Sequence, residues 1–272
     1  ATGELMAVKC VDLMNVNQEE LEEIKNEVQL LRSLRHRHVV SYIGTNQTEA
    51  SLNILMEFCP GGSVSTLSKS FGAFPEPVLQ QYTRQVTIVS CSSHPFSSRD
   101  TPDLVLYPQM VEGIQYVHDN AVMHRDIKGA NILVAANGVL KIADFGASAQ
   151  LKTVSDEDGT TSMRGTPFWM APEVIRQEKY GRPADCWSMG MTVIEMATGN
   201  YPWFKPNQQA HNKFSLMYEI ASTNHLPDIP EELSESCKDF ILRFIKRQVN
   251  ERMTAEQALQ HTFLRDVATI NF

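Results

Sequence analysis

Two polar strings near the middle of the chain constrain its fold more than any other feature. HRDIKGANIL occupies His124–Leu133, and KIADFG occupies Lys141–Gly146. The string VAANGVLK joins them and predicts a short β-hairpin. A lone Asp-Phe-Gly string fits an ordinary turn as well as a functional site. The two strings together, in this order and joined by a hairpin, are far more specific, so we expect a site at this hairpin.

Composition narrows the class of protein. A chain of 272 residues, 42% of them hydrophobic, is long enough to bury a large core in one domain or two lobes. The net charge of -8 and the mixed signs along the chain argue against a nucleic-acid partner. We find no apolar run of about 20 residues and no signal-peptide pattern, and therefore predict no membrane span. An odd number of scattered cysteines favours a reducing compartment, hence the cytoplasm: Cys10, Cys59, Cys91, Cys186 and Cys237.

The sequence has two regions that differ in predicted secondary structure. Up to Phe58 the pattern predicts a strand at ELMAVKCV, a helix from about Gln18 to Leu34, and strands at HVVSYIGT and LNILMEF. In the first strand Ala7, Lys9 and Val11 share one face. CPGGS then marks a hinge, and helical patterns dominate after it. The sequence therefore predicts a small sheet with one helix, followed by a larger helical region.

These motifs resemble the catalytic loop and the magnesium loop of eukaryotic protein kinases. The resemblance extends from Leu5 to about Leu264, nearly the whole chain. It implies an α+β, bilobal kinase-like fold with a small sheet-and-helix lobe plus hinge at 1–59 and a larger, mainly helical lobe at 60–272. The implied cofactors are ATP and Mg²⁺.

Phosphoryl transfer requires positioned groups and neutralisation of spreading negative charge, which explains these residue types. By resemblance, Asp126 faces the nucleophilic hydroxyl and Lys128 reaches the transferring phosphate. Asp144 holds Mg²⁺, with Asn131 supplying a second oxygen. All four residues are therefore predicted to belong to one site.

Lys9 and Glu27 are predicted to join this site. Glu27 lies three residues after Ile24 and four before Leu31, which places it at the edge of the apolar helix face. An inward carboxylate is costly unless it is paired, and Lys9 is the partner that the resemblance implies. This pair would let the helix switch activity. The implied nucleotide contacts are Ala7, Lys9, Glu27, Met56, Glu57, Cys59 and Asp144.

The string GTPFWMAPEVI (165–175) resembles the segment that docks protein substrates. The resemblance implies that Glu173 pairs with Arg252 and that Asp185 braces the catalytic loop. Lys128 together with Thr166 is typical of serine/threonine kinases.

Arg125, next to Asp126, favours activation by a phosphate on the nearby loop, because a phosphate would pair with its guanidinium. The candidate positions are Thr160, Thr161 and Ser162, of which Ser162 matches the family site best. Alternatively, these are ordinary polar loop residues.

Longer strings narrow the resemblance further. GTNQTEASLNILMEFCPGGSVSTL, MHRDIKGANILV and DFGASAQL are similar to the mitogen-activated protein kinase kinase kinases of the STE group, of the MEKK or plant NPK1-like type. The implied protein substrate is the activation loop of a downstream MAP kinase kinase.

The sequence departs from the family at its start. Only eight residues precede Lys9, with Gly3 the sole glycine among them, so the glycine-rich loop and the first strands are missing. We favour a fragment of a longer protein, since the other catalytic residues are present. The alternative is a non-catalytic scaffold or inactive fragment with a kinase fold.

The second departure is the segment 86–109, VTIVSCSSHPFSSRDTPDLVLYPQ. Its removal would align Leu79, Tyr82, Met110, Ile114 and Val117 on one apolar helix face, whereas its prolines cannot continue a helix. We therefore predict an atypical insertion. It begins with Val and ends with Gln, which is compatible with a retained intron; the alternative is a genuine loop with Ser97, Ser98 and Thr101 as regulatory positions.

Overall fold

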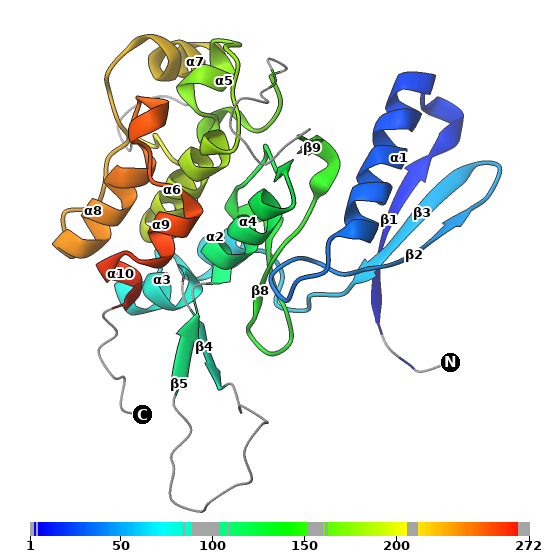
Figure 1. Cartoon of the computed structure of the whole chain (residues 1–272), viewed down its shortest axis with the longest axis horizontal. Coiled ribbons are helices and arrows are strands. Elements are labelled where there is room, and N and C mark those ends of the chain that lie inside the picture. Colours follow the sequence, from blue (N-terminus) through cyan, green and yellow to red (C-terminus); the bar gives the residue numbers. More distant parts are fainter. Residues whose placement is uncertain are drawn as a thin grey trace, which may run out of the picture.

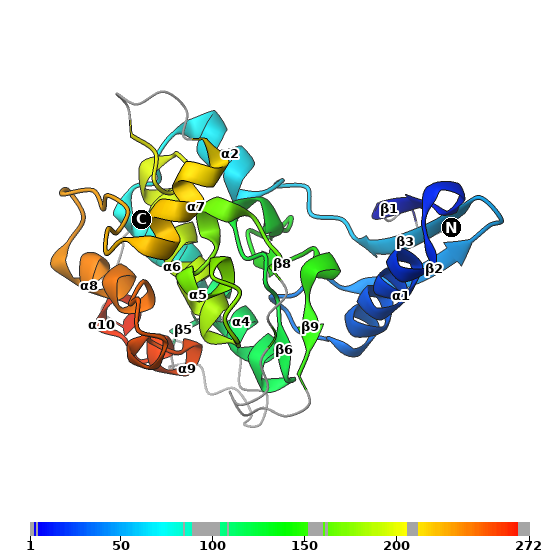
Figure 2. The ribbon, with the colours of Figure 1, turned by 90° about the horizontal axis from the view of Figure 1, so that it is seen from above.

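The structure, a computed structural model, describes residues 3, 5–83, 85–88, 104–107, 109–151, 160, 163–205 and 212–265. Figure 1 shows a small sheet with one long helix on one side and a larger group of helices on the other. Seen from above, in Figure 2, the sheet and its helix stand apart from the helical body. The predicted α+β class and two-part arrangement are confirmed.

The small sheet has three antiparallel strands in the order β1-β3-β2. Exposure alternates along β1, with Ala7, Lys9 and Val11 on the more covered face, as predicted. The helix α1 begins with a capping box in which the side chains of Asn17 and Glu20 each accept the other's backbone N–H. The bounds are β1 Met6–Asp12, α1 Gln18–Ser33, β2 Tyr42–Gln47 and β3 Ser51–Glu57.

The helical body is built around α6 (Pro183–Thr198), which is buried continuously from Ala184 to Ala197. This apolar helix packs against α8 and supplies much of the hydrophobic core. The neighbouring helices are α2 (Val64–Phe71), α3 (Glu76–Thr83), α4 (Gln109–Asp119), α5 (Pro172–Ile175), α7 (Lys213–Ser222), α8 (Glu235–Phe244), α9 (Ala255–Leu259) and α10 (Thr262–Arg265). Short strands accompany them: β6 (Val122–Met123), β7 (Ile132–Val134), β8 (Leu140–Ile142) and β9 (Ala149–Gln150).

The strand predicted at HVVSYIGT is partly wrong. β2 begins only at Tyr42, and the residues before it leave the sheet to contact the helical body. The backbone N–H of Val40 donates to the carbonyl of Ile142 at 2.9 Å, and Val39 is 1% exposed. These valines are apolar because they are buried against β8, not because they pair within the sheet.

A two-stranded hairpin separates α3 from α4. β4 (Gln85–Ile88) pairs antiparallel with β5 (Leu104–Tyr107), and Figure 1 shows the pair extending away from the helices. Relative to the predicted segment 86–109, the hairpin starts one residue earlier, and Gln109 already belongs to α4. Ser97, Ser98 and Thr101 lie outside the described residues.

The residues predicted to share one apolar helix face lie in a common core. Leu79, Met110, Ile114 and Val117 are at most 2% exposed, and Tyr82 packs against the same cluster. α3 and α4 also contact each other directly. The hairpin therefore interrupts the sequence without separating the residues that the apolar pattern groups together.

None of the helices within the described ranges combines the length and the apolar composition that a membrane span needs.

Candidate active site

The hairpin predicted between the two polar strings is present, and it places residues of the two strings side by side. β7 and β8 pair antiparallel, with Ile132 opposite Ile142. The backbone N–H of Ala143 then donates to the carbonyl of Asn131 at 2.9 Å, which extends the contact beyond the strands. Since the first string leads into β7 and the second follows β8, antiparallel pairing sets Asn131 beside the residue that precedes Asp144.

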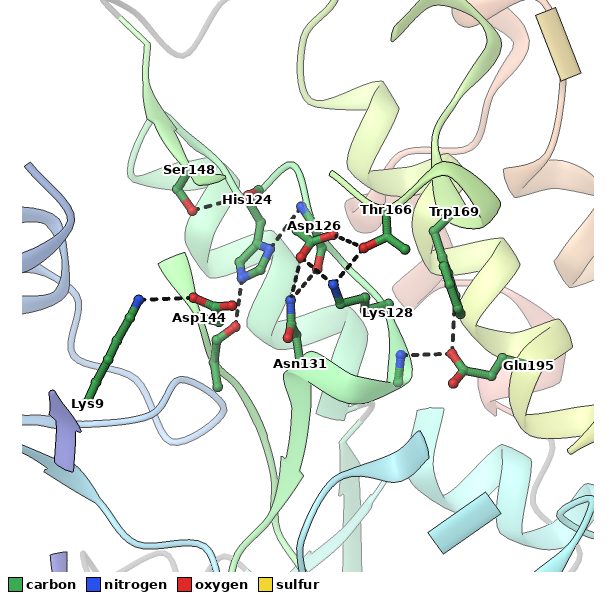
Figure 3. Close-up of polar contacts among 12 residues, drawn as sticks. Lys9, His124, Asp126, Lys128, Asn131, Asp144, Ser148, Thr166, Trp169 and Glu195 are labelled. Atoms are coloured by element: carbon green, nitrogen blue, oxygen red, sulfur yellow. Dashed lines mark hydrogen bonds and ion pairs between the residues drawn. The ribbon is translucent and has the colours of Figure 1, made fainter. Parts of the chain in front are cut away.

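Asp126 lies at the centre of a tight hydrogen-bond cluster (Figure 3). Its Oδ2 accepts from the Lys128 ammonium at 2.6 Å and from the Asn131 amide at 3.0 Å, while its Oδ1 accepts from the Thr166 hydroxyl at 2.9 Å. Lys128 also donates to the Thr166 hydroxyl at 2.6 Å. Charge-assisted hydrogen bonds of this kind fix a carboxylate in one orientation. Three of the predicted residues and Thr166 thus form one assembly.

Asp185 braces the backbone that carries Asp126. This side chain accepts from the backbone N–H groups of His124 at 2.9 Å and Arg125 at 2.8 Å, and it pairs with His118 at 2.9 Å. Burial opposes its ionisation, but the hydrogen bonds and charges of His118 and His124 together hold the pKa of Asp185 below its ordinary value. The buried carboxylate is therefore a fixed anchor for the loop.

Two backbone positions at the site are strained. Arg125 has φ 65° and Asp144 has φ 61°, in the left-handed region that residues with a side chain rarely adopt. Such conformations cost about 1–3 kcal/mol each and persist where surrounding contacts enforce them. At Arg125 these contacts include hydrogen bonds from its guanidinium to the carbonyls of Ala147 and Ser148. These carbonyls orient the guanidinium.

Lys9 and Glu27 form the predicted pair. The Lys9 ammonium lies 2.7 and 3.0 Å from the two carboxylate oxygens of Glu27, and 3.4 Å from Oδ1 of Asp144. Burial lowers the pKa of Lys9, but the hydrogen bond and charge of Glu27 raise it further, so the net direction is upward. The Lys9 side chain is 38% exposed and that of Asp144 is 52% exposed. The pair therefore borders a part of the site that a ligand can reach.

The oxygen donors beside this opening fit a magnesium ion. The Asn131 amide nitrogen donates to the backbone and side-chain oxygens of Asp126, which leaves the amide oxygen as its free donor atom. Asp144 offers a half-exposed carboxylate. Mg²⁺ takes hard oxygen ligands of this kind, one or two from the protein and others from phosphates.

Comparison with known proteins decides the family. The protein kinase domain family matches residues 1–94 and 93–264. The chain belongs to the protein kinase family.

Its relatives carry closely related names. Mitogen-activated protein kinase kinase kinase 3 of Arabidopsis thaliana is 43% identical over 269 residues, which cover 97% of this chain and 37% of that protein. The kinase kinase kinase ANP1 of the same plant is 43% identical, with 97% and 36% covered, and kinase kinase kinase A of Dictyostelium discoideum is 38% identical, with 98% and 26% covered. The resemblance to STE-group serine/threonine kinases of the MEKK type is confirmed. The kinase domain spans between about a quarter and two fifths of the length of these curated relatives.

The structure places the other residues predicted to contact the nucleotide on β1, on β3 and shortly after β3. Ala7 and Met56 are opposite each other in the β1–β3 pair. The Glu57 carboxylate pairs with Lys141 at 2.9 Å. Cys59 is 8% exposed, and burial raises the pKa of its thiol, which therefore stays protonated at neutral pH.

The predicted Glu173–Arg252 pair is fully buried. The guanidinium donates at 2.7 and 3.1 Å to the two carboxylate oxygens, and it lies 5.3 Å from the ring centre of Trp187. Its side chain is 0% exposed, against 2% for Glu173. This bidentate pair joins α5, at the end of the docking string, to the region before α9.

The candidate phosphorylation positions are only partly described. Thr160 exchanges two backbone hydrogen bonds of 3.0 Å with Tyr180, while Thr161 and Ser162 lie outside the described residues. A cavity of about 730 Å³ is bordered by Arg125, Arg164 and other polar side chains from α1 and β9.

The sequence reasoning missed Glu195 and the pair between Glu23 and Arg164. Glu195 on α6 is 5% exposed and accepts hydrogen bonds from Gly129, Trp169 and Ser65. A lone acid within the apolar string MGMTVIEMATG was a usable signal, since a buried carboxylate requires donors. The exposed pair of Glu23 and Arg164 has no comparable signal, because it joins a helix to a loop.

Proposed function

We propose that this kinase domain transfers the γ-phosphate of ATP to a serine or threonine hydroxyl of a protein substrate. The observation that carries the proposal is the Asp126 carboxylate, held by Lys128, Asn131 and Thr166. An acceptor fixed in this way orients the incoming hydroxyl and takes its proton. Lys128 places a positive charge beside the same hydroxyl, where negative charge develops during transfer.

Lys9, Asp144 and Asn131 form the nucleotide side of the proposed site. Lys9 would bind the phosphates while Glu27 orients it, and Asp144 and Asn131 would hold the magnesium ion. Bound MgATP supplies the phosphoryl group with part of its charge neutralised.

We propose the activation loop of a MAP kinase kinase as the substrate. The names of the relatives describe kinases of kinase kinases, and Thr166 in the docking string supports a serine or threonine acceptor. We also propose a cytoplasmic location from the scattered cysteines, and activation by phosphate at Ser162, Thr161 or Thr160, with the Arg125 guanidinium as the group that pairs with it.

The test is incorporation of radioactive phosphate from ATP into a catalytically inactive MAP kinase kinase. Asp126→Asn should lower the rate by about 10²- to 10⁴-fold. Asp228→Asn, which alters an exposed aspartate, serves as the matched control and should leave the rate unchanged.

A second candidate is a kinase-fold scaffold without catalysis. The β4–β5 hairpin, which interrupts the chain between α3 and α4, favours it. A scaffold would show equal background incorporation for the unmodified chain and Asp126→Asn, and no thermal shift with MgATP. Transcript sequencing separately tests the retained-intron hypothesis, which fails if every messenger RNA encodes the segment 86–109.

A further inference from the structure

A buried carboxylate lies between the catalytic loop and the docking string. Oε2 of Glu195 accepts from the backbone N–H of Gly129 at 2.8 Å and from the indole N–H of Trp169 at 3.1 Å (Figure 3). Its Oε1 accepts from the hydroxyl of Ser65 on α2. One side chain of α6 thus collects donors from three separate segments of the chain.

Two of these segments carry the donors to Asp126. Gly129 directly follows Lys128, and the backbone N–H of Trp169 donates to the carbonyl of Thr166 at 3.0 Å. Lys128 and Thr166 hydrogen-bond to Asp126 and to each other. A shift of either segment away from Glu195 would therefore move one of the donors that orient the catalytic carboxylate.

Position 129 is shaped for this contact. A Cβ on Gly129 would lie 2.7–2.8 Å from the carboxyl atoms of Glu195, closer than real Cβ atoms come. A proline there would also remove the N–H that donates. Glycine combines the donating N–H with space for the carboxylate, whereas any Cβ at this position would require the Glu195 carboxylate to shift.

The carboxylate depends on its donors. Glu195 is 5% exposed, and burial raises its pKa, while the hydrogen bonds from Ser65, Gly129 and Trp169 oppose that rise. An ionised carboxylate that loses a donor in such a place is destabilised, because water does not replace the lost hydrogen bond. Loss of one donor should therefore disturb the remaining contacts.

We propose that Glu195 is a positioning residue for phosphoryl transfer, which fastens the catalytic loop at Gly129 to the docking string at Trp169 and so fixes Lys128 and Thr166, two of the three side-chain donors to Asp126. The inference rests on the proposed function for its kinetic consequence. The contact between the two segments can be tested without it.

The kinetic test uses Trp169→Phe, which keeps an aromatic ring and removes only the indole N–H. The kcat for phosphorylation of an inactive MAP kinase kinase should fall about tenfold, the effect of losing one hydrogen bond to a buried charge. The KM for ATP should stay within about twofold, since Lys9 and Asp144 are not altered.

Trp203→Phe is the matched control. Trp203 is buried, and its indole N–H has no acceptor among the described residues, so its loss should leave kcat unchanged. Glu195→Gln keeps one acceptor oxygen, so its kcat should lie between that of the unmodified chain and that of Glu195→Ala. Equal kcat values for Trp169→Phe and Trp203→Phe would overturn the proposal.

The structural test measures hydrogen exchange of the Gly129 amide by NMR. Exchange should be slow in the unmodified chain and in Trp203→Phe, and at least tenfold faster in Glu195→Ala, because its acceptor is lost. If Glu195→Ala does not fold, Trp169→Phe replaces it, and a smaller increase in exchange is expected because the acceptor of the Gly129 amide remains while its contact with the docking string is lost. An unchanged exchange rate of the Gly129 amide in the folded variants would show that Glu195 does not hold this segment. If the unmodified chain has no kinase activity, the proposed function fails and the exchange data alone decide whether Glu195 holds the two segments.

Discussion

The helical body and the small sheet differ in how far they bury their polar and apolar side chains. In the body, α6 is buried almost along its whole length, and its acidic side chains Asp185 and Glu195 have hydrogen-bond donors. In the sheet, β1 lies at the edge, and Met6 and Val8 on it are 46% and 50% exposed. The helix α6 is therefore fixed by burial along its length, whereas β1 keeps apolar side chains exposed to solvent.

One ion pair in each region illustrates the difference. Arg252–Glu173 in the body is 0% and 2% exposed, whereas Lys9–Glu27 in the sheet region is 38% and 6% exposed. A fully buried pair is costly to break, because removal of one partner leaves the other charge buried and unsolvated. A pair that water reaches on one side can open and close at low cost, as a switch requires.

Arg252→Met should have the largest effect on stability. It leaves Glu173 charged and buried, so the free energy of unfolding measured with urea should fall by about 3–5 kcal/mol. Arg243→Met removes an exposed partner of Asp239 and should cost less than about 1 kcal/mol. Similar losses for both variants would contradict the contrast between buried and exposed pairs.

Asp185→Asn should have the second-largest effect on stability. The free energy of unfolding should fall by about 1.5–3 kcal/mol at neutral pH, because a charged acceptor is replaced by a neutral one. The folded-state pKa of Asp185 is lowered from 3.8, so its stabilisation is present above that pH and is lost as pH falls through the lower folded value. The stability difference between the unmodified chain and the variant should therefore shrink below about pH 3.8.

Thermal unfolding of both proteins between about pH 7 and pH 3 measures this dependence. A difference that stays constant over the whole range would show that the charge of Asp185 does not contribute.

Lys9→Met should cost only about 1–2 kcal/mol, since Lys9 is 38% exposed and the space that its ammonium leaves lets water reach the Glu27 carboxylate. Its larger consequence should be functional, because the thermal shift produced by MgATP should disappear. Lys25→Met, in an exposed pair with Glu22, is the control and should keep the shift. A normal MgATP shift in Lys9→Met would remove Lys9 from the nucleotide site.

Val8→Thr should have the smallest effect on folding, below about 0.5 kcal/mol, since the side chain is half exposed. An exposed apolar edge strand promotes association between chains, so light scattering at high concentration should decrease. Val249→Thr, at a 39% exposed position in the helical body, should leave association unchanged. Equal scattering from both variants would show that the edge of β1 is not an association surface.

Local pattern predicted the elements whose own residues define them. Alternation along β1, the apolar spacing of α1 and the hairpin between β7 and β8 are all confirmed. The error at the start of β2 arose because Val39 and Val40 are apolar for contact with β8, and a sequence pattern does not identify the partner surface.

The residue types of the site were also readable from the sequence. The two polar strings identified Asp126, Lys128, Asn131 and Asp144, and the edge position of Glu27 indicated that it needs a cation. These conclusions follow from chemistry that requires particular side chains in a particular order along the chain.

Only the tertiary structure decided which distant groups meet. Glu195 contacts Gly129 and Trp169 because α6 passes behind both segments, and Asp185 reaches the catalytic loop for the same reason. The sequence by itself predicted the family, which the comparison confirmed, and the residues of the candidate site, because both predictions rest on local strings that resemble kinase motifs. The packing of α6 determined how the site is held, because contacts between residues more than 25 positions apart depend on the folded arrangement of the whole body.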